Sequence, residues 1–248
     1  MDICDRHSFA SSPDLLSPEK EIADFLGVPV AGIYIECPQK TYEMRGKGKE
    51  KELSMCLFPQ SAQNRCEVSV LSLPKAPTKN RVSMDIKPSR GHSSGLWHTL
   101  MQVQSFPDKG EEWRCPPFSL EIQGGHFRAY SRWDENKVSR TFGHNCTEKG
   151  SSLSARQVFG AVPVIANQWQ TIVLNMKLSP FHDGQIGWKI GKKLGPIANG
   201  GNIFNDQRLP YLKLGIYKPA GWTEAEKREG IPNCVSYRNV KIVSFDAE

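Results

Sequence analysis

The sequence predicts an all-β protein, a β-sandwich of the jelly-roll type with a short N-terminal helix. Short segments of alternating apolar and polar residues recur along the chain. Turn-forming residues separate them, since the 248 residues include 21 glycines and 17 prolines. Helical apolar spacing is confined to one segment before the first strand, and residues 223–229 add only a short polar helical stretch. Many strands with so little helix are typical of sandwiches and jelly rolls.

The short helix is expected directly after a polar arm at residues 1–16. Ser17 is a good N-cap, and Pro18 suits the first helical position. Apolar residues then follow on one helical face, and Gly27 fits the C-cap. We therefore expect residues 1–27 to form an arm with a helix, and residues 28–248 to form one β domain.

The expected strands fill most of the β domain. They are bounded by glycine, proline, asparagine and aspartate, which favour turns. The segments are 32–36, 52–58, 65–71, 81–86, 97–104, 118–123, 127–133, 169–176, 185–190, 211–217 and 236–244.

Composition limits the classes of partner. The formal net charge of +6 favours an anionic partner. No apolar run approaches the roughly 18 residues of a membrane span, and no nucleic-acid-binding motif is present, so neither partner is expected. No metal site or cofactor is predicted, because no C-x-x-C spacing or phosphate-binding loop occurs.

The cysteines and the N-terminus bear on the compartment. Seven cysteines are an odd number, which favours reduced thiols. The first residues contain no basic segment followed by an apolar one, so no secretory signal is recognised. An intracellular protein and a mature secreted form both fit this pattern.

Three of the expected strands pair an apolar face with a face of hydrogen-bonding or ionisable groups. Residues two apart in a strand share a face. In the strand 97–104 this alternation places Thr99 and Met101 on the opposite face from His98 and Gln102. The three polar faces carry Arg65, Glu67 and Ser69; His98, Leu100, Gln102 and Gln104; and Tyr211, Lys213, Gly215 and Tyr217.

These polar faces are richer in Arg, Gln, His and Tyr than a solvated face usually is. Such side chains grip sugars and carboxylates through hydrogen bonds. If the three strands are neighbours in one curved sheet, they line a concave cleft. The plainer interpretation is an antiparallel sheet with one face in water.

The same segments resemble the jelly-roll polysaccharide lyases, which include glucuronan lyases, alginate lyases and heparin lyase I. The similarity extends over about residues 30–245 and preserves the order of the motifs. It implies a concanavalin-like β-sandwich. Three motifs show the similarity. Arg65-Cys66-Glu67 is like the family's Arg-x-Glu, and Gln102-Val103-Gln104 stands where alginate lyases have Gln-Ile-His. Residues 211–217, Tyr-Leu-Lys-Leu-Gly-Ile-Tyr, are like the Tyr-Phe-Lys-Leu-Gly-Ile-Tyr of heparin-lyase-like sequences.

The resemblance implies β-elimination at a uronic acid. The enzyme neutralises the C5 carboxylate, a base removes the C5 proton, and an acid protonates the leaving oxygen. By position, Tyr211 is then the acid or base, and Arg65 and Gln102 are the carboxylate neutralisers. Lys213 is expected to lower the Tyr211 pKa through its charge. The remaining candidates are His98 as a catalytic residue, and Gln104, Lys213, Tyr217 and Glu67 as substrate-binding residues.

Gln104 departs from the family pattern, because an amide cannot act as a general base. His98 shares its expected face but lies six residues away along the strand, about 20 Å at strand rise. Lyase activity then requires a mechanism that uses Tyr211 alone, or a histidine from elsewhere, such as His92 or His126. We expect His126 itself, like His182, to be a turn or surface residue.

Three functions fit these residues. The first is a polysaccharide lyase that cleaves an anionic, uronic-acid-containing glycan. The second is a lyase-fold enzyme repurposed for small-molecule chemistry in secondary metabolism, such as a cyclisation or a cycloaddition steered by positioning. The third is a non-catalytic, lectin-like module that binds glycans. The partner is accordingly an anionic oligo- or polysaccharide, or a small organic substrate in the same cleft.

Overall fold

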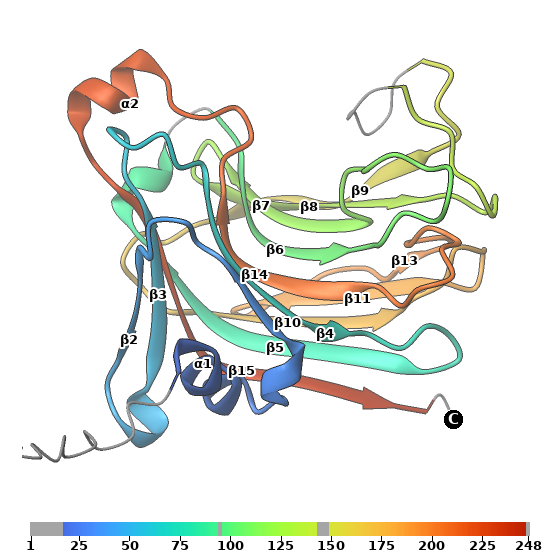
Figure 1. Ribbon diagram of the computed structural model, residues 1–248, viewed down its shortest axis with the longest axis horizontal. Helices are drawn as coiled ribbons and strands as arrows, with labels where there is room; N and C mark the ends of the chain where they lie inside the picture. Colours follow the sequence, from blue (N-terminus) through green and yellow to red (C-terminus); the bar gives the residue numbers. More distant parts are fainter. Residues whose placement is uncertain (1–16, 94–95, 143–148, 247–248) are drawn as a thin grey trace, which may run out of the picture.

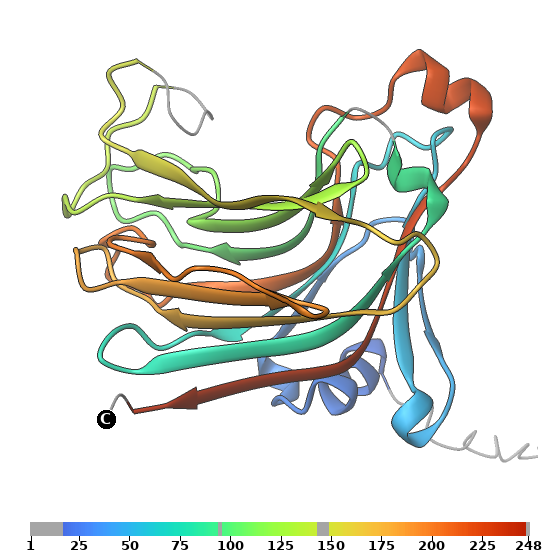
Figure 2. The ribbon, with the colours of Figure 1, turned by 180° about the vertical axis from the view of Figure 1, so that it is seen from behind.

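Two antiparallel β-sheets pack face to face and enclose the apolar core (Figures 1 and 2). The computed structural model describes residues 17–93, 96–142 and 149–246, so the expected arm at 1–16 lies outside the described residues. The all-β sandwich predicted from the sequence is confirmed. The elements are α1 Pro18–Leu26, β1 Ile33–Glu36, β2 Tyr42–Arg45, β3 Glu52–Leu57, β4 Arg65–Ser72, β5 Lys79–Pro88, β6 His98–Gln104, β7 Phe118–Gln123, β8 His126–Trp133, β9 Ser154–Pro163, β10 Gln170–Lys177, β11 Gln185–Ile190, β12 Lys193–Leu194, β13 Ala198–Asn199, β14 Tyr211–Tyr217, α2 Glu224–Glu229 and β15 Asn233–Phe245, with 3-10 turns at Val30–Gly32, Gly48–Glu50 and Arg90–Ser93.

The strand order brings distant parts of the chain together. The first sheet runs β1-β4-β14-β6-β7-β8-β9. The second runs β12-β11-β10-β5-β15-β3-β2, with β13 paired to β11. The three strands with polar faces, β4, β14 and β6, are therefore direct neighbours in the first sheet, as the cleft hypothesis requires.

Both helices are capped, and the caps of α1 are those that the sequence predicts. The Ser17 side chain accepts a hydrogen bond from the Lys20 backbone N–H, and Gly27 closes α1 in the left-handed conformation. α1 packs against β1 and β15. Thr223 and Glu226 form a capping box at α2. In the parts of the chain that the structure describes, no helix is long and apolar enough to span a membrane.

Each predicted strand is present within a few residues of its expected ends. The sequence did not identify β2, β9, β12 and β13. β12 and β13 are two residues long, too short for a period of two to be read. β9 holds Ala161 at φ +55°, and its pairing with β8 shifts register, so its pattern is broken. The division after residue 27 stays a proposal.

The expectation of reduced thiols is wrong. Cys37 is bonded to Cys66, Cys56 is bonded to Cys234, and Cys115 is also in a disulfide. Cys56 and Cys234 face each other across β3 and β15, and Cys37 follows β1 where it meets β4. Residues far apart in the sequence pair in these sheets, so spacing along the chain conceals the pairing.

A bulge in β6 overturns the predicted position of His98. Thr99 pairs with Glu121 and Met101 pairs with Leu120, so Leu100 is an extra residue that shifts the alternation. Thr99 therefore joins Gln102 on the outer face of the first sheet, while His98 turns into the interior with no exposed surface. Because a bulge adds one residue to the strand, an alternating pattern extended across it assigns the residues beyond the bulge to the wrong face of the sheet.

Tyr237 of the opposite sheet reaches across the core to this irregular backbone. Its single hydroxyl proton is shared between the carbonyls of Leu100 (2.6 Å) and Gly215 (2.9 Å), and its oxygen accepts from the Gly215 N–H (3.1 Å). β14 also shifts register against β6 here. Gly215 has φ +146°, and a Cβ at this position would lie 2.2 Å from the Cys66 carbonyl oxygen. Only glycine fits, which accounts for its place in the 211–217 motif.

His98 forms a buried pair with His92. The His92 Nδ1 hydrogen-bonds to the His98 Nε2, and the His92 Nε2 bonds to the Cys234 carbonyl at 2.6 Å. Burial lowers the His92 pKa to about 4, and the charge of Lys218 adds to the effect. Burial also lowers the His98 pKa well below its ordinary value. The pair is therefore neutral at neutral pH and belongs to the core.

Tyr237→Phe is expected to lower the free energy of unfolding by about 1–3 kcal/mol, because it leaves buried backbone groups without their partner. Chemical denaturation checks this value. Tyr34→Phe, at a tyrosine that is 65% exposed, is the matched control and is expected to change little. Equal stability of the two variants would contradict the role given to the Tyr237 hydroxyl.

Acidification from pH 6.5 to pH 4 is expected to destabilise the protein through His92. Between these pH values His92 is protonated in the unfolded chain but neutral in the folded protein. Its contribution to the free energy of unfolding is therefore fully present above pH 6.5 and is lost as the pH falls toward 4. The shift corresponds to about 3 kcal/mol. Denaturation of His92→Gln across this range is expected to show a shallower pH dependence than the wild type. His126→Gln, at an exposed turn, is the control, and an unchanged pH dependence in His92→Gln would refute the assignment.

Candidate functional site

A cleft of about 530 Å³ lies on the outer face of the first sheet. Its base consists of side chains from β4, β14, β6, β7 and β8, and residues 113–116 of the β6–β7 loop add to it. Four aromatic side chains line it: Trp97, Trp113, Tyr211 and Tyr217. The size suits a small ligand or a short stretch of a polymer.

The structure brings most of the predicted site residues together. Glu67 lies buried beside the cleft, between Arg65 and Lys213. His98 is in the core, as described above. The other six all line the cleft: Arg65, Gln102, Gln104, Tyr211, Lys213 and Tyr217.

Two carboxylates and two cations form a compact group at one side of the cleft. The Arg65 Nη1 lies 3.1 Å from both carboxylate oxygens of Glu36, and the Arg65 Nε lies 3.2 Å from Glu67. The Lys213 Nζ hydrogen-bonds to Glu36 and lies 3.8 Å from Glu67. With all four groups ionised the charges cancel. Arg65 and Lys213 therefore already hold the kind of group that a uronate would bring.

The pKa values of the two carboxylates in this group are shifted in opposite directions. Burial raises the Glu67 pKa against the opposing charges of Lys213 and Arg65. For Glu36, burial also acts to raise the pKa, but the hydrogen bond and charge of Lys213, together with Arg65, outweigh it and hold the pKa below its ordinary value. Glu36 thus stays ionised and keeps Lys213 occupied.

The two glutamines of β6 differ in what they can offer a ligand. The Gln102 Nε2 donates to the Glu67 carboxylate, so this amide is engaged within the protein. The Gln104 Oε1 accepts from the Ser105 N–H at 3.0 Å. That bond orients the Gln104 amide and leaves its Nε2 to donate into the cleft.

Tyr211 lies beside Gln104 in the strand pairing and packs on Phe106, with ring centroids 4.5 Å apart. Burial raises the Tyr211 pKa to about 12, and the charges of Glu36 and Glu67 add to the rise. The expectation that Lys213 lowers this pKa is therefore wrong. Lys213 is held by the two glutamates, whose charges act on Tyr211 in the opposite sense. At neutral pH Tyr211 carries its proton.

No histidine among the described residues lines the cleft. His92 is buried with His98, so it does not replace the missing histidine at Gln104. His126 lies at the β7–β8 turn, where its Nδ1 bonds to the Gly124 carbonyl. The predicted surface positions of His126 and His182 are confirmed.

Sequence reasoning missed Glu36, Glu121 and Arg132, which also line the cleft. The alternation of 33–36 and of 127–132 contained a signal, since polar residues there fall on one face. The strand order that brings these faces to the cleft is not visible in the sequence.

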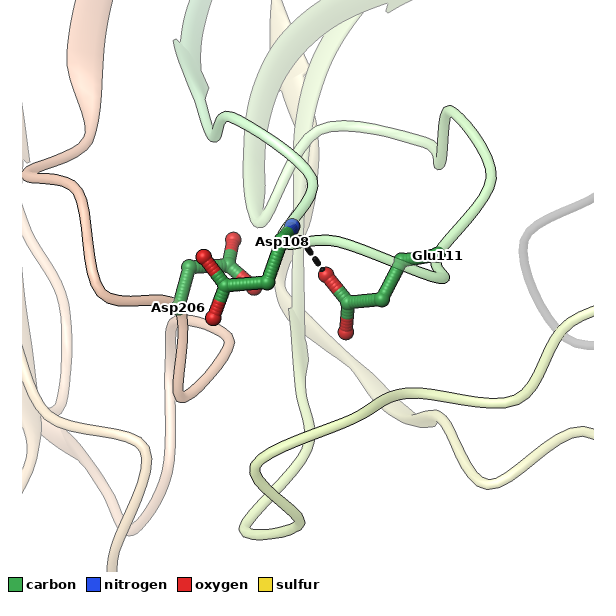
Figure 3. Close-up of side chains that lie close together, drawn as sticks. All are labelled: Asp108, Glu111 and Asp206. Atoms are coloured by element: carbon green, nitrogen blue, oxygen red, sulfur yellow. Dashed lines mark hydrogen bonds between the residues drawn. The ribbon is translucent and has the colours of Figure 1, made fainter.

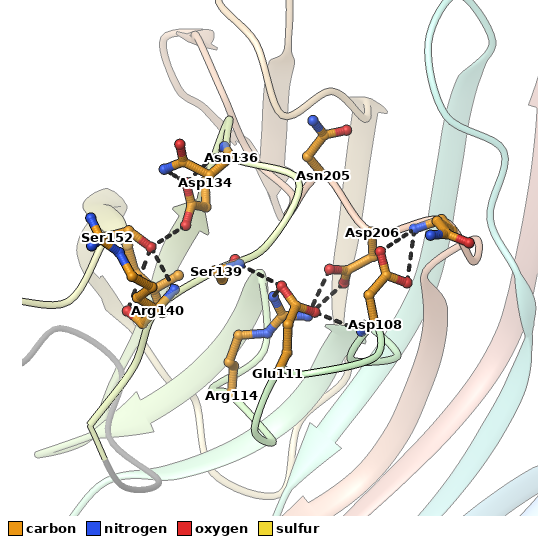
Figure 4. Close-up of polar contacts among 12 residues, drawn as sticks. Asp108, Glu111, Arg114, Asp134, Asn136, Ser139, Arg140, Ser152, Asn205 and Asp206 are labelled. Atoms are coloured by element: carbon orange, nitrogen blue, oxygen red, sulfur yellow. Dashed lines mark hydrogen bonds and ion pairs between the residues drawn. The ribbon is translucent and has the colours of Figure 1, made fainter.

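Three carboxylates converge where loops meet beside the cleft, those of Asp108, Glu111 and Asp206 (Figure 3). Arg114 lies among them and binds Glu111 at 2.8 Å and Asp206 at 2.7 Å (Figure 4). Glu111 also accepts backbone N–H groups of Asp108 and Ser139. Arg114 supplies the positive charge here, so the group joins three loops and we assign it no metal.

Residues 78–232, more than half of the chain, match the model of the polysaccharide lyase family. No curated protein matches the sequence. Solved structures with the same fold include an endo-β-1,4-glucuronan lyase from the fungus Trichoderma reesei, with a TM-score of 0.66 at 15% identity, covering 84% of this chain and 89% of that one.

Alginate lyases share the fold as well. Alginate lyase AlgAT5 from polysaccharide lyase family 7 has a TM-score of 0.51 at 11% identity, covering 91% of this chain and 98% of that chain. Alginate lyase AlyC3 has a TM-score of 0.50 at 12% identity, covering 79% of this chain and 76% of that chain. At these identities the structures show a common fold, and the family match carries the assignment. The chain is therefore a lyase that belongs to the polysaccharide lyase family, as the motifs predicted.

Proposed function

We propose that this protein cleaves a uronic-acid-containing polysaccharide by β-elimination, with Tyr211 as the residue that moves the proton. The observation that carries the proposal is Tyr211 itself, a half-buried tyrosine beside the Gln104 amide in the cleft of a polysaccharide lyase. The glucuronan lyase with the same fold makes glucuronan the first substrate to test.

The chemistry requires one group that both accepts and donates a proton, because Gln104 replaces the expected histidine. A Tyr211 phenolate takes the C5 proton, and the electrons of the C5–H bond form the C4–C5 double bond. The C4–O4 bond breaks, and Tyr211 returns its proton to the departing O4. Tyr211 ends as the phenolate with which it began, so no further reactant is needed.

The Gln104 amide supports this step without exchanging a proton. Gln104 lines the cleft next to Tyr211, and its Nε2, which has no hydrogen-bond partner among the described residues, donates to an oxygen of the sugar. Arg65 and Gln102 hold Glu36 and Glu67, and we assign them to positioning Lys213 rather than to neutralising the substrate.

Tyr211→Phe is expected to abolish the rise in ultraviolet absorbance that marks the unsaturated product, with a loss of a hundredfold or more. The assay uses a panel of glucuronan, alginate, heparin and pectate. Tyr42→Phe, at a tyrosine of the second sheet, is the control and is expected to retain activity. A flat trace from folded wild-type protein on the whole panel would refute the lyase proposal and favour the small-molecule or lectin-like function.

The turnover rate is expected to rise about tenfold for each pH unit from pH 6 to pH 10. A base with a pKa of about 12 is ionised in only a small fraction of molecules over this range, and that fraction grows tenfold per unit. Initial rates at saturating substrate, corrected for stability at each pH, test the slope. A flat profile would show that another group removes the C5 proton.

A further inference from the structure

The cations that line the cleft differ in whether a carboxylate neutralises them. Arg65 and Lys213 bind Glu36 and Glu67, and Arg114 binds Glu111 and Asp206. Among the residues that the structure describes, Arg132 has no ion-pair partner. Its Nη1 donates to the Pro116 carbonyl at 3.0 Å and to the Ser119 hydroxyl at 3.3 Å.

The carboxylate nearest to Arg132 in the sheet is already committed. Glu121 accepts from the Arg128 Nε at 2.9 Å and from the Ser119 hydroxyl at 2.7 Å. Burial lowers the Arg132 pKa, and the charge of Arg128 lowers it further, against Glu121 and Tyr130. A cation in this position has lost hydration, and the nearest countercharge, Glu121, is shared with Arg128, so an anion that binds here would compensate the cost of burial.

The guanidinium also offers the geometry that a carboxylate needs. The bonds to Pro116 and Ser119 use Nη1 and fix the side chain. Nε and Nη2 of Arg132 have no hydrogen-bond partner in the described part of the chain. These two nitrogens form the fork that binds both oxygens of a carboxylate at once.

The strand pairing places Arg132 in line with Tyr211. Tyr211 is opposite Gln104 in the pairing of β14 with β6. Because Val103 pairs with Phe118, the antiparallel register places Gln104 opposite Pro117. The Arg132 N–H bonds to the Pro117 carbonyl at 2.6 Å, which continues the row into β8. Three strand spacings separate the backbones of Tyr211 and Arg132, about 14 Å. Both side chains line the same cleft.

We infer that Arg132 binds a carboxylate of the uronate chain in the cleft, and that it selects uronates over neutral sugars. The inference rests on the proposed function and names the specificity-determining residue of the same site. It also reassigns carboxylate recognition from Arg65, which the Arg-x-Glu resemblance implied, to a residue on β8.

The test measures binding separately from turnover. Calorimetric titrations use Tyr211→Phe protein, with a β-1,4-linked glucuronate tetrasaccharide and with its neutral, carboxyl-reduced counterpart, cellotetraose. We expect the glucuronate to bind at least tenfold more tightly. Adding Arg132→Gln is expected to remove this preference and leave cellotetraose binding unchanged, which also shows that the cleft remains folded.

Two further variants separate the fork from charge alone. Arg132→Lys keeps the charge without the fork and is expected to restore only part of the preference. Arg81→Gln removes one positive charge from an exposed position on β5 in the second sheet and is expected to leave the preference intact. A preference for glucuronate that survives Arg132→Gln, or equal binding of both sugars before that change, would overturn the inference.

Turnover of proteins with Tyr211 intact distinguishes this inference from the proposed function. Preference for glucuronate that depends on Arg132, without cleavage, supports the inference and contradicts the lyase proposal. Cleavage of glucuronan with an unchanged KM in Arg132→Gln supports the lyase proposal and contradicts the inference about Arg132.

Discussion

The bond between the Tyr237 hydroxyl and the backbone of Leu100 and Gly215 is the constraint on which the cleft depends. It joins the two sheets at the point where β6 and β14 leave regular pairing. Without the extra residue in β6, His98 would face the cleft and Thr99 the core. The bulge leaves buried backbone groups without a strand partner, and Tyr237 supplies their partners. A residue of the opposite sheet thus helps to determine which β6 side chains face the cleft and which face the core.

Gly215 meets the same constraint from β14. Its backbone conformation and its approach to the Cys66 carbonyl exclude a side chain. A glycine here leaves no side chain between Lys213 and Tyr217 on the outer face of β14, and the Arg65 guanidinium lies 4.1 Å from the centre of the Tyr217 ring.

How far the sequence could predict this site differs from strand to strand. β4 and β14 alternate strictly in the sequence, so the division of their residues between the core face and the outer face matches the structure, although Glu67 on the outer face is buried. β6 alternates equally well in the sequence, but the bulge that reverses its first half leaves no mark in a pattern of period two. Glu36 was missed because its partner Lys213 lies 177 residues away and reaches it only through the strand order β1-β4-β14. The Cys37–Cys66 and Cys56–Cys234 disulfides were missed for the same reason, since each joins residues brought together by strand pairing.

The charge balance of the cleft explains why a family motif can persist while its parts change roles. Arg65, Glu67 and Lys213 occupy the motif positions, yet Glu36 closes them into a neutral group. A substrate carboxylate would have to displace Glu36, whose depressed pKa shows that Lys213 and Arg65 hold its ionised form firmly. Arg132 has no such competitor, so an incoming carboxylate gains its full charge-assisted bonds there. Recognition then lies at one end of a row across the sheet and proton transfer at the other. The Gln104 amide between them orients the sugar where a histidine would have removed its proton.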